Sequence, residues 1–104
     1  MEESKYFIGT DLKFKITITA DGFDQSSDDY KIELYCGNTQ ITINKNDIYT
    51  DPDTGDFYLL VETSKLRPGL LKMVVTAYVN DDAFPSGVRK EVTVQNLAYI
   101  KGVK

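Results

Sequence analysis

The strongest constraint in this sequence is a regular alternation of apolar and polar side chains, which recurs along most of its 104 residues. In the segment DLKFKITITA (11–20), every second residue from Leu12 to Ile18 is apolar, and the residues between them are lysine or threonine. Successive side chains of a strand point to opposite faces, so this period of two predicts a strand with one buried face. The same period predicts inward-facing side chains in five further strands: 30–36 (Ile32, Leu34, Cys36), 39–44 (Ile41, Ile43), 56–62 (Phe57, Leu59, Val61), 70–79 (Met73, Val75, Ala77, Val79) and 88–94 (Val88, Val92, Val94).

Turn and break signals connect these strands. Gly37 and Asn38 alone separate two of them, and this two-residue link predicts a hairpin because both residue types tolerate a positive φ angle. The segment TSKLRPG predicts a single helical turn, capped by Thr63 or Ser64. In the last strand Lys90 shares the phase of the valines, so we expect it to escape the core at an edge or a bulge.

The strand pattern predicts an all-β fold. Six main strands, with short extensions at 6–8, 48–49 and 97–100, are typical of an antiparallel β-sandwich of six to seven strands, immunoglobulin-like in the broad sense. A small barrel is the alternative fold. The Cys…Trp…Cys pattern of a true immunoglobulin domain is absent, because the chain has no tryptophan and one cysteine. We expect residues 1–104 to form one domain, since this is close to the commonest domain size. Its ends are candidates for arms that order only on assembly: 1–8 and 97–104.

The composition argues against several classes of function. The chain has no histidine, and its single cysteine, Cys36, lies on the apolar phase of a strand, where a core residue is expected rather than a nucleophile. A net charge of −4 argues against binding to nucleic acid. No segment resembles a signal peptide or approaches the roughly 18 to 20 apolar residues of a membrane span. No motif assembles a nucleophile, a base and an orienting group. We therefore expect no enzymatic activity, no cofactor and no membrane partner, and synthesis in the cytoplasm without secretion.

One acidic segment has the composition of a metal site. The sequence DPDTGDFYLLVE contains Asp51, Asp53 and Asp56, and acids at positions 1, 3 and 12 of a loop are typical of a calcium-binding EF-hand. The EF-hand pattern also requires glycine at position 6 and flanking helices, whereas here Gly55 precedes Asp56 and a strand follows. We therefore favour a hairpin tip, with Gly55 in a left-handed conformation. The three aspartates remain the candidates for a metal site.

Acidic residues gather in three long loops, 20–29, 45–56 and 80–87, which contain ten of the sixteen acids. If successive strands alternate in direction, all three loops lie at one end of the domain. Such an end could hold calcium, contact a basic partner or a glycan, or serve as a solvated end that resists aggregation. A complete additional strand near 48–49 would move the tip of the second loop to the other end.

Exposed apolar side chains mark a second candidate surface. Two strands that we predict to be neighbours carry Tyr58 and Leu60 on one and Val74 and Tyr78 on the other, with Tyr35 nearby. Tyrosine and leucine on a sheet face often mark protein contact, but a terminus or the second sheet could equally cover them. With three aromatic residues of the terminal segments, the candidate interface comprises Tyr35, Tyr58, Leu60, Val74, Tyr78, Tyr6, Phe7 and Tyr99.

Two stretches, GTDLKFKITITADGFD and TSKLRPGLLKMVVTAYVNDD, resemble small β-sandwich proteins encoded among the structural genes of phages and prophages of gut Bacteroidales. The resemblance extends over nearly the whole chain. It implies a virion component: a capsid auxiliary (decoration), head-fibre, or neck- or tail-associated protein. It also implies other virion proteins as partners, a multi-copy assembly, and location in the virion after synthesis in the host cytoplasm. It identifies no catalytic or ligand-binding residue.

The sequence therefore supports two functional hypotheses. The first is a non-enzymatic structural or interaction protein of a phage particle. The alternative is an immunoglobulin-like binding or adhesion module whose acidic loops contact a basic partner, Ca²⁺ or a glycan.

Overall fold

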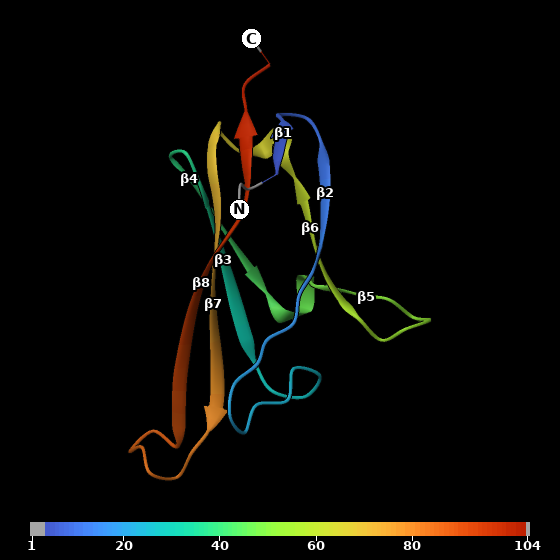
Figure 1. The fold of residues 1–104 in the computed structure, drawn as a ribbon. Helices are drawn as coiled ribbons and strands as arrows, with labels where there is room; N and C mark the ends of the chain where they lie inside the picture. Colours follow the sequence, from blue (N-terminus) through green and yellow to red (C-terminus); the bar gives the residue numbers. More distant parts are fainter. Residues whose placement is uncertain (1–3, 104) are drawn as a thin grey trace.

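The alternating segments form two β-sheets that face each other across an apolar core (Figure 1). The computed structural model describes residues 4–103. The five-stranded sheet has the order β1 (Lys5–Phe7), β8 (Val88–Lys101), β7 (Gly69–Asn80), β3 (Tyr30–Cys36), β4 (Thr39–Asn44). The three-stranded sheet has the order β2 (Asp11–Lys15), β6 (Phe57–Glu62), β5 (Tyr49–Thr50). Two short 3₁₀ turns, η1 (Lys45–Asp47) and η2 (Thr63–Lys65), connect the sheets. The predicted all-β sandwich is confirmed, with two more strands than the six main ones and with one parallel pair, β1 and β8.

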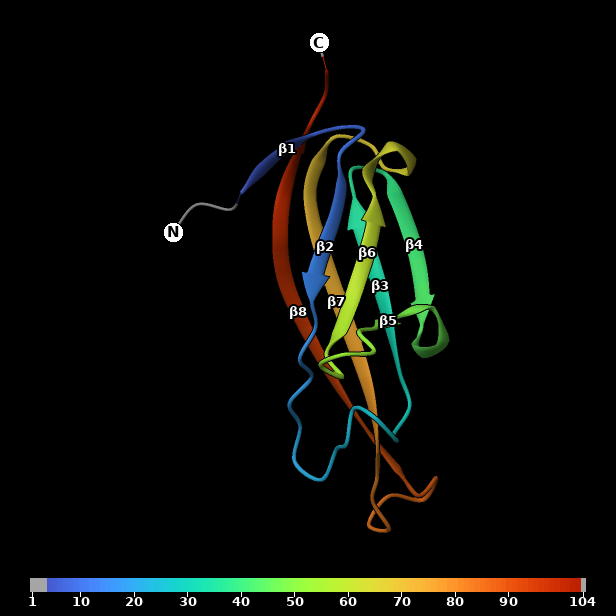
Figure 2. The same cartoon turned by 90° about the vertical axis from the view of Figure 1, so that its right-hand side faces the viewer.

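The core lies between β7 and β3 on one side and β2 and β6 on the other. On β7 the alternate residues from Leu71 to Val79 are all buried, as the period of two predicts. From the opposite sheet Leu12, Leu59 and Val61 pack against the same cluster. The shorter sheet covers only part of the longer one, so the two ends of β8 have different surroundings (Figure 2).

The predicted inward phase of the last strand is wrong. Val92 and Val94 are 62% and 61% exposed, because they pair with outward-facing residues of β7, Thr76 and Val74. The inward positions of this part of β8 carry polar side chains, since the three-stranded sheet does not reach them. Lys90 shares the outward face with the valines, so it needs no escape from the core.

A β-bulge then restores the apolar phase near the end of β8. The register between β7 and β8 shifts between Leu71 and Lys72, which leaves Leu97 as the extra residue on β8. Beyond the bulge Ala98 and Ile100 are fully buried. A bulge changes which side chains face inward, and here it divides β8 into a polar-inward half and an apolar-inward half.

The first long strand ends earlier than its pattern predicts. β2 stops at Lys15, although the alternation continues to Ala20. Beyond it the side chain of Gln25 takes the place of a strand partner: its Oε1 accepts from the N–H of Ile18 at 2.9 Å, and its Nε2 donates to the carbonyl of Ile16 at 3.1 Å. Ile16 stays buried, so its predicted inward direction is correct even though its strand assignment is not.

The terminal segments belong to the sheet of the single chain. β1 runs parallel to the end of β8, with Lys5 opposite Tyr99 and Phe7 opposite Lys101. The described parts of 1–8 and 97–104 are thus strands of the larger sheet, and their role as arms that order on assembly stays a prediction. Residues 1–3 and 104 lie outside the described range.

The β3–β4 hairpin packs against the segment that leads into β7. Gly37 has a φ angle of 60°, whereas the φ angle of Asn38 is not positive. This combination indicates a type II′ turn, because a type I′ turn requires a positive φ angle at both central residues. A Cβ atom on Gly37 would lie 2.9 Å from the Cβ of Arg67 and from the carbonyl oxygen of Pro68. Beside this contact Cys36 is buried, as predicted, and its Sγ donates to the Arg67 carbonyl at 3.0 Å. Burial raises the pKa of the Cys36 thiol.

A buried threonine ties the start of β2 to the end of β6. The hydroxyl of Thr63 donates to the carbonyl of Thr10 at 2.6 Å and accepts from the N–H of Gly9 at 2.9 Å. The residue that precedes η2 is Glu62, and no side chain caps the turn. The predicted cap at Thr63 or Ser64 is therefore wrong, because the Thr63 hydroxyl faces the neighbouring chain segment.

We expect Thr63→Val to lower the free energy of unfolding by about 1–3 kcal/mol, because the substitution keeps the side-chain shape but removes two hydrogen bonds, each contributing about 0.5–1.5 kcal/mol. Urea denaturation of the purified chain measures this difference. Thr42→Val, on the exposed side of β4, is the control and should change stability by less than about 0.5 kcal/mol. Equal effects of the two substitutions would contradict the role assigned to Thr63.

We expect Gly37→Ala to destabilise the chain more than Gly55→Ala. Both glycines have a positive φ angle, 60° and 78°, so alanine is strained at both, by about 1–2 kcal/mol. Only at Gly37 does the added Cβ also meet neighbouring atoms, since nothing lies within 4 Å at Gly55. Thermal unfolding of the two variants provides the comparison, and a smaller loss for Gly37→Ala would refute the close packing.

Candidate interaction surface

The outward-facing side of the five-stranded sheet carries the main exposed apolar surface. In its centre Val74 of β7 pairs with Val94 of β8. Val92 lies two residues before Val94 and faces the same side of β8. Tyr78 lies four residues further along β7, and Tyr35 on β3 lies on the other side of Val74, opposite Lys72. We call these five residues the outer face. Within residues 4–103, no further strand or helix covers them (Figures 1 and 2).

Charged and polar side chains border the outer face. Lys72 lies opposite Tyr35 on one side of Val74, and Lys90 lies opposite Tyr78 on the other. Thr76 lies between the two β7 members of the patch and is only 8% exposed. An apolar centre with a polar border is the usual composition of a protein contact surface.

The structure distributes the eight predicted interface residues over three places. Tyr35, Val74 and Tyr78 belong to the outer face, and Phe7 and Tyr99 lie on the same side of the sheet at its terminal end. The remaining three residues lie elsewhere: Tyr6, Tyr58 and Leu60.

Tyr58 and Leu60 lie on the opposite side of the sandwich. We predicted β6 and β7 to be neighbours, but they belong to different sheets because η2 carries the chain across. Their outward faces therefore point in opposite directions. Lys13 covers part of this second face, with its Nζ 4.5 Å from the ring centre of Tyr58, so that Leu60 stands among polar side chains.

Tyr6 is not an exposed contact residue. It is opposite Ile100 in the β1–β8 pair, on the inward side, and it packs against the core cluster. Its neighbour Phe7 is exposed, with the Nζ of Lys101 5.1 Å from its ring centre.

Sequence reasoning missed Val92 and Val94 as surface residues. Their valine-rich alternation was assigned to the core, although Lys90 on the same phase was the signal that this side faces solvent. Valine also favours strands whether or not its face is buried, so strand preference alone does not give the direction.

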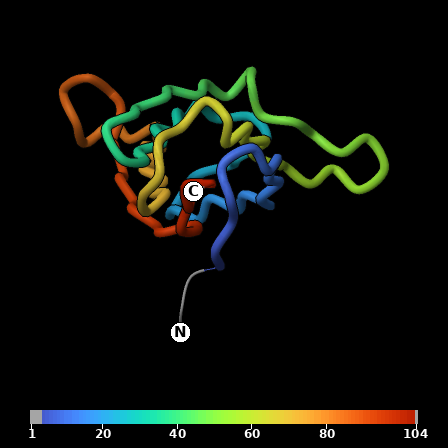
Figure 3. Tube along the Cα trace, turned by 90° about the horizontal axis from the view of Figure 1, so that it is seen from above, coloured from blue at the N-terminus to red at the C-terminus, as the bar shows by residue number. Residues whose placement is uncertain are grey.

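The acidic loops do not form one cluster. Loops 20–29 and 80–87 lie at the end opposite β1 and the end of β8, but the tip at 51–56 projects sideways (Figures 1 and 3). Seen from above, the tip at 51–56 and the loop at 80–87 point to opposite sides of the molecule (Figure 3). The predicted single acidic end therefore holds for two of the three loops.

Each acidic loop has a basic residue beside it. Lys45 donates to the carbonyls of Ser26 and Asp28 at 3.2 Å and 2.7 Å. Arg89 lies 3.8 Å from Asp81 and donates to the carbonyl of Asp21 at 2.6 Å. Positive charge within the loops reduces the field that would attract a basic partner.

Local hydrogen bonds also occupy the acidic side chains. The carboxylate of Asp24 accepts from the hydroxyl and the N–H of Ser26, at 2.7 Å and 3.0 Å. These bonds lower the pKa of Asp24. The bonds are turn contacts of the kind that aspartate makes in many loops.

The three candidate metal ligands, Asp51, Asp53 and Asp56, lie in a hairpin tip, which is the structure that the sequence favours over an EF-hand loop. The carboxylate of Asp51 accepts a hydrogen bond from the N–H of Asp53 at 2.8 Å. The carbonyl of Asp51 accepts one from the N–H of Gly55, also at 2.8 Å. Asp56 lies 3.5 Å from the ammonium of Lys15 on β2. Within the described range of 4–103, no group of three or more cysteine or acidic residues is arranged to hold a metal ion.

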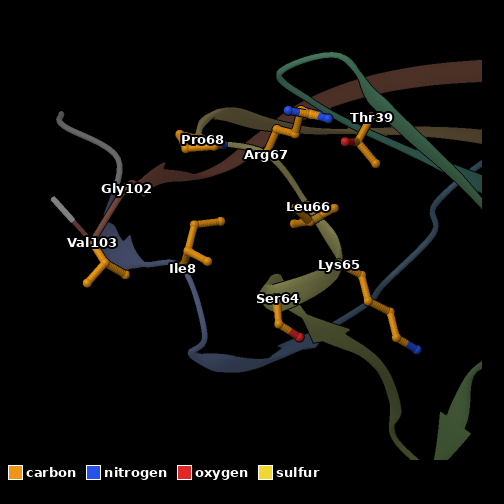
Figure 4. Close-up of a pocket in the computed structure, with 9 residues that line it drawn as sticks. All are labelled: Ile8, Thr39, Ser64, Lys65, Leu66, Arg67, Pro68, Gly102 and Val103. Carbon is orange, nitrogen blue, oxygen red and sulfur yellow. The ribbon is translucent and has the colours of Figure 1, made fainter.

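One hollow lies at the end of the sandwich where β1 and β8 finish (Figure 4). Its volume is about 570 Å³, and the η2–β7 segment forms most of its wall. Lys65 and Arg67 extend from it in different directions and do not converge on one point (Figure 4). The ammonium of Lys65 pairs with Glu62 at 2.9 Å. Among residues 4–103, no carboxylate or histidine side chain lines the hollow, so these residues supply no acid–base pair there.

Comparison with protein-family models, with curated proteins and with solved structures finds no match for this chain. In the part of the chain that the structure describes, no helix has the length and apolar character needed to cross a membrane.

We expect calcium to leave the melting temperature unchanged, because local turn bonds and Lys15 already engage Asp51 and Asp56. A ligand that binds only the folded chain at a hundred times its dissociation constant stabilises it by about 2.7 kcal/mol, so binding would be visible. Thermal unfolding in millimolar calcium and in chelator tests this. A calcium-dependent increase that Asp51→Asn abolishes would show that the tip is a metal site.

Proposed function

We propose that this chain is a non-enzymatic structural and interaction protein whose outer face contacts another protein. The observation that carries the proposal is the apolar patch of Val74, Val92, Val94, Tyr78 and Tyr35 on an uncovered sheet face. Burial of such side chains is the main favourable contribution to association, at about 25 cal/mol per Å² of apolar surface. On the opposite face the charged Lys13 lies over Tyr58, so a partner there would have to desolvate an ammonium group.

We infer further that the sandwich is immunoglobulin-like in the broad sense. The order β8-β7-β3-β4 corresponds to the G-F-C-C′ sheet of a variable-type domain, and β2-β6-β5 corresponds to B-E-D. Such sandwiches serve many unrelated functions, so this likeness supports a binding scaffold without naming its partner.

We propose a phage particle as the assembly in which this contact is made. The support is the resemblance of two long stretches to structural proteins of phages and prophages of gut Bacteroidales. In this role the chain would be made in the host cytoplasm and incorporated in several copies as a capsid auxiliary, head-fibre or tail-associated protein. Repeated copies follow the symmetry of a particle, which favours one contact face used many times.

We expect this chain in purified particles, and we expect Val74→Lys to reduce its incorporation several-fold, because a charge in the centre of the outer face must be desolvated on contact. Quantitative mass spectrometry of particles measures the copy number. Leu60→Lys, on the opposite face, is the matched control and should leave incorporation unchanged. Circular dichroism of both variants verifies that they fold.

Absence of the chain from particles would refute the particle assignment. Incorporation that depends on Leu60 and not on Val74 would instead refute the choice of face.

A further inference from the structure

The edge of β8 is free along most of its length. β1 pairs only with Tyr99–Lys101, and among residues 4–103 no strand pairs with the same edge from Val88 to Leu97. Figure 2 shows this edge at the margin of the sheet, below β1. A free edge presents a row of unpaired N–H and C=O groups that can pair with another strand.

The backbone groups of the exposed valines point to this free edge. In a strand of L-residues, all residues whose side chains point to one face of the sheet direct their N–H and C=O groups to the same edge of the strand. Outward-facing Tyr99 donates its N–H to Ser4, and the carbonyl of Lys101 accepts from Ile8, both at 2.8 Å and both on the β1 side. Val92 and Val94 face outward too, so their N–H and C=O groups point to the same side, where β1 does not reach.

The centre of this edge lacks the features that usually prevent pairing. From Val92 to Asn96 the strand carries no charge and no proline. Natural proteins block free edges with charged residues or proline, with bulges, or by keeping the edge strand very short. Here the bulge at Leu97 lies beyond this stretch.

We propose that this edge binds the same edge of a second copy of the chain, antiparallel and about a two-fold axis at Thr93. In this register Val92 lies opposite Val94 of the second copy, and Val94 lies opposite Val92. Outside these pairs, Glu91 lies opposite Gln95, and Lys90 lies opposite Asn96. Glu91 and Lys90 therefore each face a neutral amide, and no like charges meet. The two five-stranded sheets become one continuous sheet, with an isologous contact.

The pairing places the outer-face valines of both copies side by side. The edge-facing groups of Val92 and Val94 form two hydrogen-bonded pairs around the non-hydrogen-bonded pair at Thr93. Aliphatic β-branched neighbours on one sheet face stabilise strand pairing. The valines thus contribute both their backbone groups and their side chains to the contact.

The other edge of the sheet is a poorer candidate. β4 is also uncharged from Thr39 to Asn44, but its isoleucines, Ile41 and Ile43, are half-buried against the core. Pairing there would bring less exposed apolar surface together than at β8, where the two valines are 62% and 61% exposed.

The inference rests on the proposed function only in assigning the chain a role in assembly. Sedimentation equilibrium of the purified chain alone, over micromolar to millimolar concentrations, therefore tests the dimer separately. A chain that stays monomeric throughout would overturn the dimer and leave incorporation into particles untouched.

Two double variants test the register. Val92→Lys with Val94→Lys places lysine opposite lysine twice and should weaken the dimer by more than about tenfold. Val92→Lys with Val94→Glu places lysine opposite glutamate twice and should retain the dimer. Both substitute the same exposed positions, so a difference between them reports the pairing and not the fold. Thermal unfolding of both confirms that each monomer is folded.

Three further results would overturn the proposal. A dimer that neither double variant weakens would use another surface, such as the β4 edge. Loss of the dimer in both variants would contradict the register about Thr93. A dimer that forms only after deletion of residues 1–3 would make the N-terminus of the chain itself the occupant of the edge.

Discussion

The central pairing of β7 with β3 and β8 holds the rest of this structure in place. β7 contributes an unbroken series of alternate buried residues, from Leu71 to Val79, and its two edges position both neighbouring strands. A single strand therefore fixes the register of the two strands beside it, and β4 and β1 pair with those in turn. The smaller sheet then covers the inward side of β3 and β7, where Leu59 and Val61 complete the core.

The unequal size of the two sheets accounts for the candidate surfaces. Five strands face three, so the smaller sheet does not cover the inward side of β8 before the bulge, and polar residues such as Thr93 and Gln95 occupy it. The apolar residues of this stretch are consequently displaced to the outward side. One geometric mismatch thus produces the outer face and leaves the neighbouring strand edge available.

Much of the fold follows from the alternation of the sequence. The alternation identifies the strands and the inward residues of β2, β3, β4, β6 and β7, because their period of two is continuous and one face is buried. It fails on β8, where the bulge at Leu97 breaks the period and valines occupy the solvent side. It also overextends β2, because the Gln25 side chain replaces a partner strand by a contact that no periodicity reveals.

The candidate site was less accessible from sequence than the fold. Assigning Tyr58 and Val74 to one surface required knowing which strands are neighbours, and η2 moves the chain between sheets without any clear signal in its residues. The hairpin tip at 51–56, by contrast, was predictable, since the order of Gly55 and Asp56 and the strand that follows both distinguish it from an EF-hand loop.

The buried thiol gives this molecule an internal reporter. Cys36 is the sole cysteine of the chain, and its Sγ lies against the carbonyls of Arg67 and Gly69, behind the Gly37 contact. Burial raises the pKa of the thiol, so the reactive thiolate is disfavoured while the hairpin stays packed against residues 67–69. A thiol reagent can therefore reach Cys36 only when the β3–β4 hairpin separates from the start of β7. The rate of its modification measures how often the end of the sandwich opens, without any added label.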